Sequence, residues 1–235
     1  MDFAKPLIRA ELLRRYKRFL ADVRFADGAA ATAHCPNPGS MLGLTEPGSE
    51  VWLSESDDAA RKLRFGLELV RAGGSLVGVN TGRANAIVAE ALAAGRVAQL
   101  RGYTQVRREV AMGTNSRVDF LLEGPGLPIC YLEVKSVTLR RDSGGPGTAE
   151  FPDVVTARGS RHLCELARLA GQGHQAVLLY LVQRGDCTKF RLAADIDPAY
   201  ARAAADAAQA GVTTLCYTCS VSPDGIGLER PLEIV

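Results

Sequence analysis

The sequence predicts an α/β (α+β) protein in which a small β-barrel precedes a domain with the element order α-β-β-β-α-β. Two observations lead to this prediction. The first eighty residues contain short β-type segments separated by turns rich in glycine and proline. Beyond residue 80, alanine-rich helical patterns alternate with apolar strand patterns. We therefore expect two domains, which cover residues 1–82 and 83–235.

Five short strands are expected in the N-terminal domain. Their predicted positions are 14–25, 29–36, 50–56 and two segments within 62–80. Residues 37–49 form a loop of turn-forming residues between the second and third strands. Short strands joined by such turns are typical of a small barrel of the oligonucleotide-binding (OB) type.

The C-terminal domain combines helices and strands. The predicted elements are a helix over 80–95, strands over 104–112, 116–123 and 128–137, a helix over 156–173, a strand over 175–184, a helix over 197–211 and a strand over 213–222. The segment 175–184 begins with a continuous apolar run, which is typical of a strand covered on both faces. The polar, glycine-rich segment 138–150 is expected to be a mobile loop.

Composition excludes several classes of protein. The chain has no apolar run of about 18 residues and its first residues lack the apolar core of a signal peptide, so we expect a cytoplasmic protein without membrane association. A net charge of +2 says little about nucleic acid. Cys216 and Cys219 form a C-x-x-C pair, but no second pair completes a zinc site. We expect both to be buried free thiols.

Charged residues interrupt the apolar strand predicted at 128–137. Glu133 and Lys135 fall on one face of this strand because strand side chains alternate. If the loop before it folds as a hairpin, Asp119 lies across from Glu133. Two adjacent carboxylates repel unless a cation or proton lies between them, and Mg²⁺ prefers such oxygen ligands. The three residues could thus support metal-assisted phosphodiester hydrolysis. The alternative is a solvated salt bridge between Glu133 and Lys135.

Three further groups of residues could contact DNA. They are the basic stretch Arg14, Arg15, Tyr16, Lys17 and Arg18, the loop residues Asn37 and Ser40, and the helix-start residues Arg158 and Arg161. Cations interleaved with an aromatic ring are typical of nucleic-acid binding, and helix N-termini favour anions. The alternatives are a solvated edge strand, a local turn and simple helix capping. His162 has no spaced partner histidine and is not expected to bind metal.

The element order and the acid followed by Glu-x-Lys resemble the core of PD-(D/E)XK nucleases, which bind divalent metal and cleave DNA. The resemblance implies that Asp119 and Glu133 are metal ligands and that Lys135 is the catalytic lysine. It also implies that the Val134 carbonyl could bind metal and that Glu90 is the candidate ligand on the first helix. Val118 stands where the motif name has proline.

Seven stretches in order extend a resemblance over nearly the whole chain. They are RYKRFLADV, HCPNPGSM, VNTGRAN, SRVDFLLE, YLEVKSVTL, FPDVVTARGSRHLCEL and IDPAY. Together they resemble the sugar fermentation stimulation protein A family of prokaryotes. This resemblance implies an N-terminal OB-like domain, a C-terminal nuclease-like domain, DNA binding without strong sequence preference and a regulatory role in sugar (maltose) metabolism.

Two functions therefore stay open. One is a DNA-binding regulator on a nuclease-like frame, and the other is an active Mg²⁺- or Mn²⁺-dependent DNA nuclease. The intact set of Asp119, Glu133 and Lys135 favours an active metal site. The expected partner is DNA, and an oligomer is possible.

Overall fold

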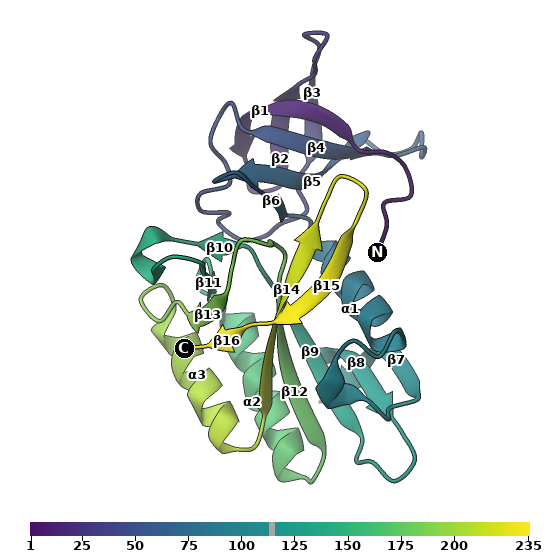
Figure 1. The fold of residues 1–235 in the computed structure, drawn as a ribbon, viewed down its shortest axis with the longest axis vertical. Helices are drawn as coiled ribbons and strands as arrows, with labels where there is room; N and C mark the ends of the chain where they lie inside the picture. Colours follow the sequence, from purple (N-terminus) through teal and green to yellow (C-terminus); the bar gives the residue numbers. More distant parts are fainter. Residues whose placement is uncertain (113–115) are drawn as a thin grey trace.

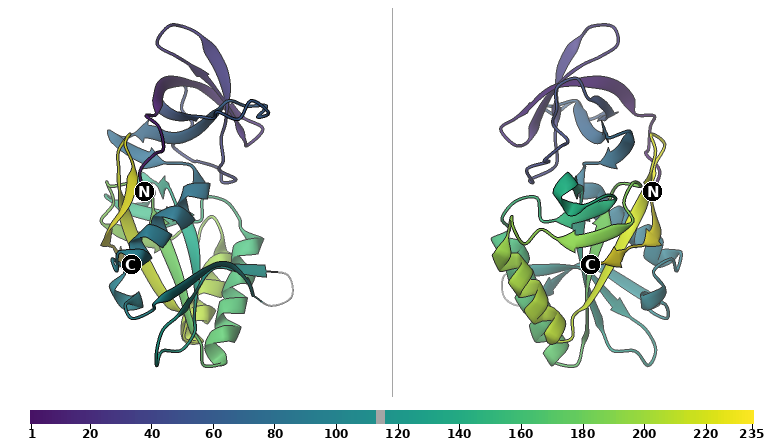
Figure 2. Two further views of the ribbon diagram at one scale, coloured as in Figure 1. Left: turned by 90° about the vertical axis from the view of Figure 1, so that its right-hand side faces the viewer. Right: turned by 60° about the vertical axis from the view of Figure 1, so that its left-hand side comes forward.

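The computed structural model describes residues 1–112 and 116–235. A β-barrel lies at one end of the molecule, and a larger α/β domain carries both chain termini near its middle (Figure 1). Figure 2 shows the same arrangement from two further sides. The barrel loops and the tip of the β14–β15 hairpin lie where the two domains meet (Figure 1).

Six strands build the N-terminal sheet. They are β1 (Ile8–Tyr16), β2 (Leu20–Arg24), β3 (Ala30–His34), β4 (Glu50–Glu55), β5 (Phe65–Ala72) and β6 (Ser75–Gly78). The strand order is β3-β2-β1-β4-β5-β6, and β3 also pairs with β5 in parallel, which closes a five-stranded barrel. Alternate side chains such as Ala21 and Val23 are fully buried inside it, as strand periodicity requires.

The basic stretch is divided by a turn, which corrects the prediction of one strand over 14–25. Lys17 and Arg18 adopt left-handed conformations with φ of 47° and 65°. Two consecutive residues with positive φ connect β1 to β2 in the manner of a tight hairpin. Lys17 and Arg18 therefore project from a turn and do not share strand faces with Arg14 and Arg15.

Six strands form the central sheet of the second domain. They are β7 (Gln105–Met112), β8 (Ser116–Glu123), β9 (Cys130–Val137), β12 (Gln175–Val182), β14 (Thr213–Val221) and β15 (Ile226–Pro231). Their order is β15-β14-β12-β9-β8-β7, and the central strand β12 runs parallel to β9 and β14. Every residue of β12 after Gln175 is buried, which explains its continuous apolar sequence.

Helices cover both faces of this sheet. Helix α1 (Ala84–Ala93), preceded by the 3₁₀ turn η1 (Thr81–Arg83), lies on one face, and α2 (Ala157–Gly171) with α3 (Pro198–Gln209) lies on the other. The 3₁₀ turn η2 (Ala98–Leu100) follows α1. Cys216 packs in the α2–α3 core and Cys219 in the α1 core. They are buried free thiols, and burial raises the pKa of Cys219 to about 12. Because they face opposite cores, they cannot share one zinc ion.

The glycine-rich segment 138–150 is structured, contrary to the expected mobile loop. It contains β10 (Leu139–Arg140), η3 (Asp142–Gly144) and the first residues of β11 (Thr148–Phe151). With β13 (Lys189–Leu192) and β16 (Glu233–Ile234) these strands form a second, four-stranded sheet. The fully buried Glu150 carboxylate accepts hydrogen bonds from Arg141 and Arg191, and these contacts hold the segment in place.

The first residues of the chain pack on the second domain. The Met1 ammonium donates a hydrogen bond to the Ile226 carbonyl at 2.9 Å, and Met1 and Phe3 contact the α1 core. Among the described residues, no helix has both the length and the apolar character needed to cross a membrane.

Candidate metal and nucleic-acid site

The site begins where the antiparallel ladder between β8 and β9 ends. The last backbone pair is Phe120 with Leu132, so by the same register Asp119 faces Glu133. The Asp119 carboxylate accepts the Val134 N–H at 2.7 Å and the Asn85 side-chain amide at 2.8 Å. The Asp119 side chain thus accepts the hydrogen bond that the Val134 N–H would donate to a backbone carbonyl if the ladder continued. This contact holds Asp119 against β9.

Glu133 is buried on the face of the sheet that α2 covers. Its Oε1 atom accepts a hydrogen bond from Lys135 Nζ at 2.6 Å and another from Nδ1 of the buried His162. Its Oε2 atom is buried, and no residue in the described part of the chain offers it a hydrogen bond. A buried carboxylate oxygen without a partner carries a desolvation cost, which a bound cation would remove.

The two carboxylates differ in their titration. Burial and the nearby charge of Glu133 raise the pKa of Asp119, despite its hydrogen bonds. Burial would also raise the pKa of Glu133, but the hydrogen bond from His162 and the charge of Lys135 outweigh it and hold that pKa below its usual value. The pKa values of the two carboxylates are therefore shifted in opposite directions, and a cation near Asp119 would lower the pKa of that carboxyl.

A chain of polar contacts leads from Glu133 to the protein surface. Arg158 Nε donates to His162 Nε2 at 3.4 Å, so that nitrogen is an acceptor and Nδ1 carries the proton donated to Glu133. This role of His162 was not predicted from the sequence. A sequence pattern does indicate that His162 is buried, because His162, Leu166 and Leu169 recur at helical spacing on the buried face of α2.

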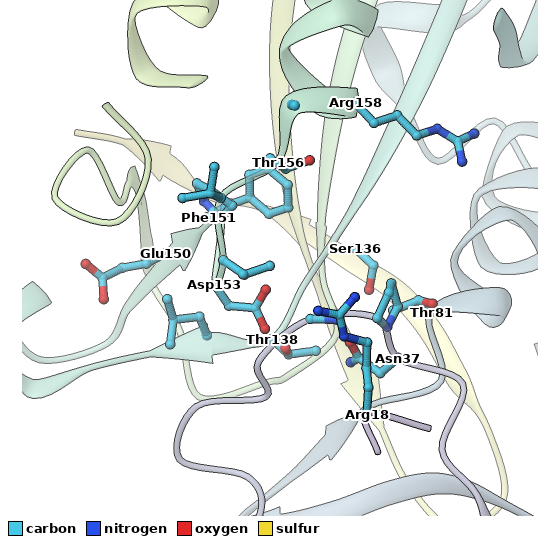
Figure 3. Close-up of a pocket in the computed structure, with 17 residues that line it drawn as sticks. Arg18, Asn37, Thr81, Ser136, Thr138, Glu150, Phe151, Asp153, Thr156 and Arg158 are labelled. Carbon is cyan, nitrogen blue, oxygen red and sulfur yellow. The ribbon is translucent and has the colours of Figure 1, made fainter. Parts of the chain in front are cut away.

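A pocket of about 380 Å³ opens beside this chain of contacts, between the barrel and the start of α2. Arg18 and Asn37 line it from the barrel, Thr156 and Arg158 from the start of α2, and Ser136 from β9 (Figure 3). Ser136 follows Lys135 directly, and Arg158 contacts His162. The pocket and the carboxylate pair are thus neighbouring parts of one region.

Comparisons with known proteins agree with this architecture. Residues 82–225 match the family described as "Sugar fermentation stimulation protein RE domain", and residues 13–79 match "SfsA N-terminal OB domain". The chain belongs to the sugar fermentation stimulation protein family. This confirms the predicted family and the predicted α/β (α+β) fold of an OB barrel followed by an α-β-β-β-α-β domain.

Relatives match over their whole length. The sugar fermentation stimulation protein homologs of Paramagnetospirillum magneticum and Rhodospirillum centenum are each 57% identical over 234 residues, which is 100% of this chain and 98% and 99% of the two relatives. The structure is also similar to that of Pyrococcus furiosus SfsA in complex with Ca²⁺, with a TM-score of 0.90 and 26% identity over 100% of this chain and 98% of that chain.

Glu90, the family-based candidate for a further ligand, lies elsewhere. Its carboxylate pairs with the Met1 ammonium at 2.7 Å, and 54% of its side chain is exposed. Asn85 is the α1 residue that contacts Asp119, and Glu90 lies about 140° further round the helix. Among the described residues, no three His, Cys, Asp or Glu side chains gather closely enough to hold a metal. A ligand set here would need the two carboxylates with backbone or water oxygens.

Much of the predicted DNA-binding stretch has structural partners. Arg15 donates hydrogen bonds to the carbonyls of Asn37, Gly39 and Ser40, so its guanidinium holds the barrel loop. Arg14 pairs with Asp22 at 2.8 Å. Tyr16 is half-buried beneath Arg14, and its hydroxyl donates to Asp22 at 3.2 Å, whereas Lys17 and Arg18 are exposed.

Asn37 and Ser40 also act within the fold. Asn37 is buried, and its side chain donates to the Val79 carbonyl and accepts the Gly39 N–H. Ser40 Oγ donates to the Asp153 carbonyl at 2.6 Å. These contacts favour the turn interpretation and fasten the barrel loop to the segment before α2.

The residues at the start of α2 divide into capping and exposed groups. Thr156 caps the helix by accepting the Gly159 N–H, as the alternative interpretation predicted. Arg158 and Arg161 are exposed on the first turn of the helix. Both remain candidates for phosphate contact.

Proposed function

We propose that the chain binds DNA without strong sequence preference and hydrolyses its phosphodiester bonds with Mg²⁺ or Mn²⁺ at Asp119, Glu133 and Lys135. The buried Glu133 Oε2 atom without a hydrogen-bond partner carries this proposal. A surface salt bridge would not place a glutamate 3% exposed beside a second carboxylate whose pKa is raised. A divalent cation between the two removes their repulsion.

The residues present fit such an ion. Asp119 and Glu133 would hold it, and the Val134 carbonyl is the backbone candidate beside them. The relative from Pyrococcus furiosus was crystallised in complex with Ca²⁺, a cation that also takes oxygen ligands. When bound, the ion would supply Lewis-acid stabilisation of a phosphoryl group.

The other side chains have separate roles in this proposal. Lys135 places a positive charge beside the carboxylate pair, where it can balance charge on a phosphate. His162 holds Oε1 of Glu133 through Nδ1, which leaves Oε2 for the metal. His162 is thus a positioning residue of the kind that orients metal ligands.

A second candidate function is DNA binding without cleavage, in a cytoplasmic regulator of sugar (maltose) metabolism. One observation favours it: Lys135 Nζ is bound to Glu133 at 2.6 Å, so a lysine that neutralises a buried carboxylate is not free for chemistry. The family name comes from sugar fermentation, which suggests the regulatory context.

The test is incubation of single- and double-stranded DNA with the protein in Mn²⁺, Mg²⁺ or EDTA. We expect cleavage that requires metal and falls at least 100-fold in Glu133→Gln and in Lys135→Ala. Glu229→Gln, which changes an exposed glutamate on β15, is the matched control. Glu90→Gln should also retain cleavage, because Glu90 pairs with Met1. DNA binding without cleavage under all these conditions would favour the regulator.

A further inference from the structure

We propose that the pocket between the barrel and α2 holds one unpaired nucleotide, so that the substrate is single-stranded DNA or a frayed DNA end. This inference rests on the proposed function and names the substrate of its site. The pocket volume of about 380 Å³ lies within the range of small-molecule sites. A paired base is stacked in the duplex and would first have to be extruded, which costs free energy that an unpaired base does not require.

Two arginines line this pocket, Arg18 from the β1–β2 turn and Arg158 from the start of α2 (Figure 3). Within the described ranges, no hydrogen bond or ion pair engages the Arg18 guanidinium, which projects from the β1–β2 turn. Arg158 contacts His162 through Nε, which leaves its terminal nitrogens open to a ligand. Guanidinium groups bind phosphate oxygens with directional hydrogen bonds, so both arginines suit a nucleic-acid backbone.

The acidic residues in the lining are neutralised or engaged. Glu150 accepts hydrogen bonds from Arg141 and Arg191 and is fully buried. Asp153 accepts the Met41 N–H at 2.9 Å. Asp153 keeps its negative charge, but with Glu150 neutralised the lining carries two positive charges, Arg18 and Arg158, against this one, and the positive balance favours an anionic ligand.

The remaining walls suit a base and a sugar. The Phe151 ring lines the pocket and packs against Tyr180 and Tyr200 with ring centroids 5.5 and 5.1 Å apart, so this aromatic wall is fixed in place. Val155 is 67% exposed beside it, unusually so for an apolar side chain. Ser136 accepts a hydrogen bond from Gln183, and its hydroxyl donates to no other residue that the structure describes. Apolar walls with a few polar groups are typical of ligand sites.

Arg158 joins this pocket to the carboxylate pair. It lines the pocket and also contacts His162, which in turn binds Glu133. A strand whose terminal nucleotide enters the pocket would therefore bring its next phosphate toward Glu133 and Lys135.

The test compares Arg18→Asn with Lys17→Asn in full-length protein. Both residues are exposed and occupy adjacent positions of one turn with left-handed backbone conformation. Each substitution removes one positive charge, and asparagine tolerates the left-handed conformation. Of the described residues in this turn, only Arg18 lines the pocket. Binding of labelled single-stranded and blunt duplex DNA is measured in EDTA, with thymidine monophosphate as a competitor.

We expect Arg18→Asn to weaken single-stranded DNA binding about tenfold and duplex binding much less, while Lys17→Asn weakens both only slightly. Equal losses in the two variants, or equal losses for both DNA forms, would overturn the pocket assignment and leave the proposed function standing. If thymidine monophosphate bound as tightly as the oligonucleotide, the pocket would be a mononucleotide site, and the assignment of a DNA strand to this pocket would also be overturned. Absence of any DNA binding and cleavage by the unmodified protein would refute both proposals.

Discussion

The Asp119 carboxylate accepts the backbone N–H of Val134 at 2.7 Å, at the point where β8 and β9 stop pairing. This contact ties an acid of one strand to the residue that follows Glu133 on the next. It explains how two carboxylates that repel are held together in the fold, since a backbone donor compensates part of the cost. The consequences can be measured.

Divalent metal should stabilise the protein. Mn²⁺ at about 100 times its dissociation constant would add about 2.7 kcal/mol to the free energy of unfolding, which corresponds to a rise in Tm of about 5–10 °C. Glu133→Gln should lose most of this shift, because it removes the charge on the unpartnered oxygen. Thermal unfolding with Mn²⁺ and with EDTA checks this, with Glu229→Gln as the control. An equal shift in Glu133→Gln would place the metal elsewhere.

His162 should act through Glu133. His162→Phe removes the donor to Oε1 and should lower both cleavage and metal affinity about 10–100-fold. His162→Asn can place an amide N–H near the position of Nδ1 and should restore most of the loss. Metal affinity is measured by titration of the Tm shift, a readout that does not depend on turnover. If the asparagine variant behaved like the phenylalanine variant, a positioning role would be wrong.

Gly39 should be needed for docking of the barrel loop. A methyl group at this position would overlap the Asp153 carboxylate, so Gly39→Ala should lower the free energy of unfolding by about 1–3 kcal/mol. Adding Asp153→Ala removes the overlapping atoms and should recover part of that loss. Gly171→Ala, at the end of α2 where nothing lies within 4 Å, is the control and should be neutral or slightly stabilising, because alanine favours a helix over glycine. Urea unfolding measures all four proteins.

Glu150 should make stability depend on pH. Burial would raise the pKa of Glu150, but Arg141 and Arg191 hold it below its usual value. Its ionised form therefore stabilises the fold above the unfolded-state pKa of about 4.3, and this stabilisation is lost as pH falls through the lower folded-state pKa. Glu150→Gln should cost about 3 kcal/mol at pH 7, because it removes the buried carboxylate that Arg191 pairs with and leaves Arg141 only the exposed Asp195.

The same measurement at lower pH tests the sign of this effect. The difference in unfolding free energy between the unmodified protein and Glu150→Gln should shrink as pH falls from 5 to 3. Glu165→Gln, which removes an exposed pair with Arg168, should stay within about 0.5 kcal/mol of the unmodified protein throughout. A difference that grows toward acid pH would contradict the lowered pKa of Glu150.

Local patterns in the sequence determined the fold class and the central part of the site. Strand alternation placed Glu133 and Lys135 on one face, and the short loop before them set Asp119 opposite Glu133, because both depend on neighbours within about fifteen residues. Helical spacing likewise identified the buried face of α2, on which His162 lies.

Tertiary structure decided which charged residues are free. Arg15 and Arg18 are alike in the sequence, yet Arg15 binds three loop carbonyls while Arg18 faces a pocket. The contact between His162 and Glu133 joins residues 29 positions apart, and that between Ser40 and Asp153 joins residues 113 apart. No local period encodes such contacts, because the packing of α2 on the sheet makes the first and the packing of the two domains makes the second.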